Sequence, residues 1–211
     1  EVDRTGPETR ISLPKDSSRV SDIVDIKGAA YGPADFKQYR VYIGKGAIPT
    51  EWNIIRTSPV PTSYGALAQW DTLGLSEDVY SIKLEAEDLK GNINTHQVTV
   101  TVDNTPPSTP VLISATPNNS DIALTWQANT EADLGGYLLY RNGQLANATS
   151  IAIGNLKPYL ITGTTYQDRS APDGKFKYYL TAMDQAGNIS DQSNALEADL
   201  DTHPPHMTIT E

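Results

Sequence analysis

The sequence of 211 residues contains no cysteine and only three histidines, two phenylalanines and two methionines. The absence of cysteine excludes disulfides and thiol chemistry, and with them the class of small secreted domain that depends on disulfides. No apolar run approaches the ~20 residues that cross a bilayer, and no basic and apolar leader opens the chain. The lack of such a run predicts no direct membrane insertion. Because the first residue is glutamate instead of methionine, we expect a piece of a longer protein.

Positive charge is also scarce. Sixteen Lys and Arg against 26 Asp and Glu give a formal net charge of −10 at pH 7, and the basic residues form no cluster. Such a chain repels a phosphate backbone, which argues against nucleic acid as a partner. The 38% of hydrophobic and 20% of charged residues predict a folded chain with room for two domains of about 100 residues. A cysteine-free acidic composition is typical of bacterial exported proteins, so we expect an extracellular or cell-surface location.

Three similar segments divide the chain. They read "DRTGP" at 3–7, "DNTPP" at 103–107 and "DTHPP" at 201–205. Prolines in a row favour an extended path without ladder hydrogen bonds, which interrupts a sheet and separates compact units. We therefore interpret these segments as joints between neighbouring domains.

The sequence between the joints repeats as well. At an offset of 98, "QYRVYIGKG" (38–46) aligns with "GYLLYRNGQ" (136–144). At an offset of 96, "YSIKLEAEDLKGN" (80–92) aligns with "FKYYLTAMDQAGN" (176–188). Two aligned blocks in the same order identify two copies of one structural unit, and the small difference in offset is what loops of unequal length would give.

The aligned blocks alternate apolar and polar residues, which is the period of a strand with one buried face. Asp88 to Asn92, Asp184 to Asn188 and Asn142-Gly143 carry hairpin-turn signals. Seven short strands in each copy predict antiparallel sandwiches. The predicted strands of the first copy are 9–13, 22–30, 36–43, 52–57, 66–71, 79–87 and 95–102. Those of the second copy are 110–115, 121–127, 136–141, 149–153, 164–168, 175–183 and 192–199.

The predicted fold is thus all-β, with two consecutive antiparallel β-sandwich domains at 7–103 and 108–200 and linker remnants at 1–6 and 201–211. The run "DIALTW…GYLLYRNGQ…KFKYYLTAMDQAGNISDQS" of the second domain resembles a fibronectin type III domain. In the first domain, "FKQYRVYIGKG", "ALAQWDTLGL" and "YSIKLEAEDLKGN" resemble a bacterial Ig-like domain of large surface or secreted proteins. Neither resemblance carries catalytic residues; it implies spacer, adhesion or accessory roles.

One position departs from the repeat. Gly28 aligns with Trp126 at offset 98, so the first domain lacks the large ring that we expect in the core of the second. A glycine there leaves a void that costs several kcal/mol unless another group fills it. We expect Trp70 or Trp52 to supply a core ring.

The sequence argues against an enzyme. It has no Gly-Xaa-Ser-Xaa-Gly elbow, His-Glu-Xaa-Xaa-His motif or phosphate-binding loop. His96 reads as an ordinary strand residue, and the extended spacing of His203 and His206 around two prolines does not bring their rings together. We expect no catalytic residues and no cofactor.

Calcium is the one metal that the sequence leaves open. Hard cations prefer clustered carboxylates, and five aspartates fall near the predicted domain ends: Asp88, Asp103, Asp184, Asp199 and Asp201. The alternative is that Asp88 and Asp184 cap their own turns, while Asp103 and Asp201 form local hydrogen bonds ahead of the prolines.

Loop aromatics raise the question of a sugar ligand. Tyr31, Trp52, Tyr64 and Tyr159 lie in or near predicted loops, where exposed rings can stack on a saccharide. Such rings also pin loops onto sandwiches, which is the alternative.

Two functional hypotheses follow. The first is a non-catalytic spacer, adhesion or interaction module of a larger bacterial extracellular or cell-surface protein. The second is an accessory carbohydrate-binding region of a secreted polysaccharide-acting enzyme. The expected partners are neighbouring domains of the same polypeptide and a protein or polysaccharide at a surface, and the expected state is a monomer.

Overall fold

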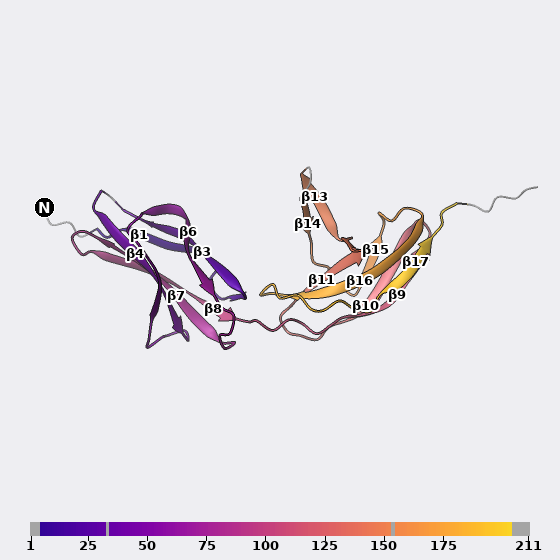
Figure 1. The fold of residues 1–211 in the computed structure, drawn as a ribbon, viewed down its shortest axis with the longest axis horizontal. Helices are drawn as coiled ribbons and strands as arrows, with labels where there is room; N and C mark the ends of the chain where they lie inside the picture. Colours follow the sequence, from indigo (N-terminus) through magenta and orange to yellow (C-terminus); the bar gives the residue numbers. More distant parts are fainter. Residues whose placement is uncertain (1–4, 33, 153–154, 204–211) are drawn as a thin grey trace, which may run out of the picture. The chain divides into compact units, whose positions relative to one another are not determined.

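The computed structural model describes residues 5–32, 34–152 and 155–203. These residues form strands and turns without a helix, and therefore include no helix that could cross a membrane. The chain divides into two compact units (Figure 1), of which the first ends at Thr105 and the second begins at Pro106. The predicted all-β fold is confirmed.

The first unit is a sandwich of two sheets. One sheet has the strand order β1-β3-β6, and the other has the order β2-β8-β7-β4-β5. Its paired strands are antiparallel except for β2 and β8, which run parallel. The strands are β1 (Glu8–Leu13), β2 (Ser18–Val20), β3 (Ile23–Tyr31), β4 (Phe36–Lys45), β5 (Asn53–Ser58), β6 (Thr62–Asp71), β7 (Val79–Asp88) and β8 (Ile93–Val102).

The second unit packs a three-stranded sheet, β15-β10-β9, against a four-stranded sheet, β12-β11-β16-β17. A separate hairpin, β13-β14, extends from this sandwich (Figure 1). The strands are β9 (Val111–Asn118), β10 (Asp121–Gln127), β11 (Leu134–Arg141), β12 (Gln144–Leu145), β13 (Ala148–Ala152), β14 (Asn155–Pro158), β15 (Thr165–Asp168), β16 (Gly174–Asp184) and β17 (Leu196–Leu200).

Each unit has its own hydrophobic core, built from the alternate residues of its strands. In β10, for example, Ile122, Leu124 and Trp126 are buried while the residues between them are partly exposed. Trp126 belongs to the core of the second unit, and Trp70 belongs to that of the first. The prediction that Trp70 or Trp52 supplies a core ring is confirmed by Trp70.

Backbone lies close to Gly28, so the glycine leaves no void there. A Cβ atom added to Gly28 would lie 1.9 Å from the carbonyl oxygen of Arg10 on the neighbouring strand β1. Two main chains therefore approach closely at this point, and the glycine is needed for that approach.

The predicted hairpin turns are present. Asp88 and Asp184 each begin a turn in which the glycine three residues later has a positive φ, and both Asn142 and Gly143 have positive φ. The strand predicted at 192–199 begins only at Leu196. Before it, the hydroxyls of Ser190 and Ser193 accept hydrogen bonds from backbone N–H groups of β16, in place of a regular ladder.

Candidate functional site

The four aromatic candidates lie at three places. Tyr31 and Tyr64 line one hollow of the first unit, Trp52 lies against the other sheet, and Tyr159 belongs to the second unit. The structure therefore brings together two residues that are 33 positions apart in the sequence.

The hollow of Tyr31 and Tyr64 lies on the sheet β1-β3-β6 and has a volume of about 340 Å³. This volume reaches the lower end of the range of small-molecule sites, about 300–1,000 Å³. Strand register explains its composition, because Tyr31 lies directly opposite Glu8, and Ala29 opposite Arg10. The lining residues are Glu8, Arg10, Ser12, Lys15, Gly28, Ala29, Tyr31, Ser63 and Tyr64.

The two tyrosines differ in how firmly they are held. Tyr64 is 78% exposed, and its side chain makes no polar contact with a described residue, whereas Tyr31 is 37% exposed. The hydroxyl of Tyr31 donates a hydrogen bond to Glu8 Oε2 at 2.9 Å, and this bond raises the pKa of Tyr31 because it favours the neutral phenol. Tyr31 is thus an oriented ring, and Tyr64 is free to adapt to a ligand.

Two cations and one carboxylate line the hollow. Within the described part of the chain, neither the Arg10 guanidinium nor the Lys15 ammonium forms an ion pair, although both residues are exposed. Glu8 contributes the only carboxylate among the lining residues. The hollow therefore carries a net positive charge in a chain whose net charge is −10.

Trp52 has a different environment. The Nζ atom of Lys83 lies 4.5 Å from the centroid of the Trp52 ring and 4.4 Å from that of Tyr42. Tyr42 also contacts Trp52 edge to face, at 6.4 Å between centroids. A cation over a ring is attracted by the negative face of the π-system. A sugar that stacked on this face of Trp52 would have to displace the ammonium group.

Tyr159 lines another hollow, of about 400 Å³, in the second unit. Its hydroxyl is 3.1 Å from that of Tyr166, and Arg169 and Ser170 also line this hollow. Burial and this hydrogen bond raise the pKa of Tyr166. Tyr159 is thereby linked to a partly buried ring, so it serves at least to pin its loop.

Two of the calcium candidates cap turns. Oδ1 of Asp88 accepts a hydrogen bond from the backbone N–H of Asn92 at 2.9 Å, and Oδ2 accepts one from the Asn92 side chain at 2.7 Å. Asp184 binds Asn188 in the same two ways, both at 2.8 Å. The two carboxylates belong to different units. Both carboxylates therefore cap their own turns, which was the alternative to a calcium site.

The other candidates lie at the ends of the units. Asp103 accepts a hydrogen bond from Arg19 at 3.1 Å, and Asp199 lies 3.8 Å from Lys175. Asp201 lies near Asp173 and His203, and one potential ligand atom of each residue lies within 4.8 Å of the other two. The sequence predicted no metal binding by Asp173 or His203. All three are exposed, and His203 Nδ1 is 2.6 Å from Asp173 Oδ2. His206 lies outside the described residues.

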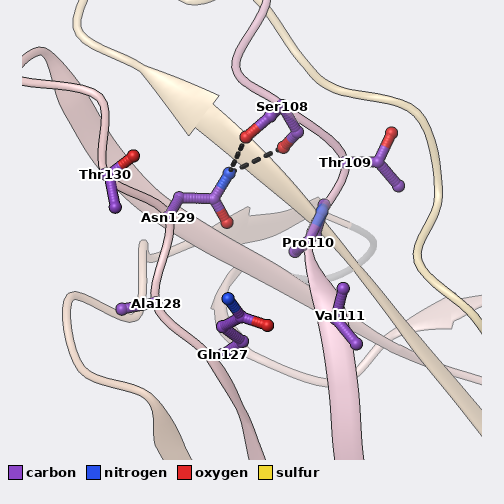
Figure 2. Close-up of a pocket in the computed structure, with 8 residues that line it drawn as sticks. All are labelled: Ser108, Thr109, Pro110, Val111, Gln127, Ala128, Asn129 and Thr130. Carbon is purple, nitrogen blue, oxygen red and sulfur yellow. Dashed lines mark hydrogen bonds between the residues drawn. The ribbon is translucent and has the colours of Figure 1, made fainter.

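A further hollow, of about 160 Å³, lies where the second unit begins (Figure 2). Its wall includes Ser108 and Asn129, whose side-chain amide donates hydrogen bonds to the Ser108 carbonyl at 2.7 Å and hydroxyl at 3.0 Å. No local sequence pattern relates Ser108 to a loop 21 residues later, so this contact could not be predicted. The hydrogen bonds attach the segment after the proline pair to the second unit.

No family model matches the chain. Curated relatives match parts of it. They are Exoglucanase B of Cellulomonas fimi (32% identical over 62% of this chain), Chitinase Chi52 of Paenibacillus xylanexedens (35% over 46%) and Chitinase A1 of Niallia circulans (30% over 56%). The matches span only 12%, 17% and 17% of the lengths of these three proteins, respectively.

Solved structures share the fold. The fibronectin(III)-like modules of Clostridium thermocellum CbhA match with a TM-score of 0.59 and 14% identity, over 96% of this chain and 99% of theirs. The FN1–FN3 domains of chicken CNTN1 match with a TM-score of 0.56 and 15% identity, over 86% of this chain and 67% of theirs. The resemblance to Ig-like and fibronectin type III modules is thereby confirmed for the fold.

Proposed function

We propose that this chain is a non-catalytic accessory segment of a bacterial extracellular enzyme that acts on a polysaccharide, and that it contacts the polysaccharide through the hollow of Tyr31 and Tyr64. The three curated relatives, an exoglucanase and two chitinases, support the enzymatic setting. Each match covers only a small part of the relative, and this supports an accessory role.

The proposal depends on one observation: Tyr31 and Tyr64 line the same hollow on a sheet, and both rings are exposed. Aromatic rings offer a flat apolar surface that the C–H faces of a sugar can cover, and their hydroxyls hydrogen-bond at the rim. Polar side chains around the rings supply the few directional contacts that orient a ligand. Both ingredients are present in the hollow.

The second candidate is a spacer or adhesion module without affinity for sugar. The separate cores of the two units favour it, because independent sandwiches are suited to extending a polypeptide. Both candidates predict a chain without hydrolytic activity. A turnover of glycosides, esters or peptides that a point mutation abolishes would contradict both.

Binding of the 211-residue chain to insoluble cellulose and chitin separates the candidates. We expect retention on at least one of them, and loss of retention in the Tyr31→Ala/Tyr64→Ala variant. Tyr159→Ala is the matched control, since it removes an exposed tyrosine from the other unit. The spacer would be favoured if the double variant were retained as well as the unaltered chain. It would also be favoured if the unaltered chain were retained on no polysaccharide.

A further inference from the structure

The hollow of Tyr31 and Tyr64 carries information about the charge of its ligand. Arg10 and Lys15 line it, and neither forms an ion pair with any described residue. These two cations line one hollow together with a single carboxylate, that of Glu8, in a chain with 26 acidic residues. An anion from outside the chain would complete this arrangement.

The local geometry explains why Arg10 remains unpaired. Glu8 and Arg10 are two residues apart on β1, so their side chains point to the same face of the sheet. The Glu8 carboxylate nevertheless accepts its hydrogen bond from Tyr31, its cross-strand neighbour. The guanidinium of Arg10 is left at the hollow with its donors available.

We propose that the hollow binds an acidic polysaccharide, namely one whose sugar rings carry carboxylate groups. This inference rests on the proposed function and specifies its ligand. The rings of Tyr31 and Tyr64 would stack on the sugar, and Arg10 would hold the carboxylate through two parallel N–H···O bonds. Lys15 would add a second, less directional positive charge.

Charge complementarity favours this ligand over a neutral chain. A neutral polysaccharide would leave both cations without a partner, whereas a polyuronate places a carboxylate on every ring. The chain as a whole carries a net charge of −10 and repels such a polymer, so binding would depend on the two cations of this hollow. Dependence on these two cations makes the binding sensitive to single substitutions.

The test compares two polymers with one backbone, polygalacturonate and highly methyl-esterified pectin, in affinity gels containing a calcium chelator. We expect retardation by polygalacturonate, with an affinity about tenfold higher than for the esterified polymer, and weakening by salt. Arg10→Gln and Lys15→Gln should remove this preference. Glu8→Gln should strengthen binding several-fold, because it removes a carboxylate that would repel the carboxylate of the polymer.

Lys175→Gln is the control for net charge, since it makes the same charge change on an exposed side chain of the second unit. It should leave the preference intact. An equal loss in this variant, or equal affinity for the two polymers, would overturn the acidic ligand. A second comparison uses dextran sulfate and dextran. Retardation by dextran sulfate but not by polygalacturonate would also overturn the carboxylate assignment.

The outcomes also separate this inference from the proposed function. Tyrosine-dependent binding to cellulose or chitin, with no preference for polygalacturonate, would overturn the acidic ligand and leave the accessory role standing. Failure to bind any of these polymers would overturn both.

Discussion

Ser108 donates two hydrogen bonds to one carboxylate oxygen of Glu131, from its backbone N–H at 2.7 Å and from its hydroxyl at 2.5 Å. These bonds attach the first residues of the second unit to the loop that follows β10. Because they stabilise the charged carboxylate, they lower the pKa of Glu131 from 4.5 to about 2. The attachment of this segment therefore depends on pH.

A carboxyl group with a lowered pKa stabilises the folded state above its unfolded pKa, and this contribution is lost as the pH falls through the folded value. For Glu131 the loss runs from about pH 4.5 down to about pH 2. We expect the Ser108 amide proton, followed by NMR, to titrate with a midpoint near pH 2. The Glu131→Gln variant should lack this titration. A midpoint near pH 4.5 would show that the carboxylate is not held by Ser108.

The two cores predict two independent unfolding events. Trp126 is 3% exposed, and its ring packs against Tyr137 at 5.4 Å between centroids. Trp126→Ala should therefore lower the unfolding free energy of the second unit by about 3–5 kcal/mol and leave the first unchanged. Trp70→Ala should do the reverse. Calorimetry of both variants checks this, and one merged transition that shifts as a whole would contradict separate cores.

Gly28 and Gly65 form a matched pair, since they face each other across β3 and β6. A Cβ at Gly28 would lie 1.9 Å from the Arg10 carbonyl, whereas one at Gly65 would meet only a Thr62 methyl at 3.5 Å. Gly28→Ala should lower the unfolding free energy of the first unit by ~2 kcal/mol or more. Gly65→Ala should change it by less than ~0.5 kcal/mol. Equal effects in denaturant titrations would refute the close approach of β1 and β3.

The turn carboxylates give a prediction about calcium. Asp184 accepts hydrogen bonds from the backbone and side chain of Asn188, so its oxygens already have donors. We expect Asp184→Ala to destabilise the second unit by ~1–3 kcal/mol, and calcium or a chelator to leave the melting temperature of the unaltered chain unchanged. A calcium-dependent rise that Asp88→Ala, Asp184→Ala or Asp201→Ala abolishes would instead establish a metal site.

Local patterns were enough to predict most of the fold. Alternating residues identify β10 and β16 because a strand with one buried face needs a period of two. The Asp-Xaa-Xaa-Gly-Asn runs predict the turns at Asp88 and Asp184 because the glycine takes a positive φ that other residues avoid. Strands β2, β12 and β14 have only 3, 2 and 4 residues, and they were not predicted.

The candidate site depended on contacts between distant segments. The sequence singled out Tyr31 and Tyr64 separately, but only the pairing of β1, β3 and β6 brings them to one hollow with Arg10 and Lys15. The same kind of pairing places Lys83 over Trp52 and backbone against Gly28. Strand periodicity determines which residues face outward, whereas register between strands determines which of them meet, and a shift of one residue would move each side chain to the opposite face.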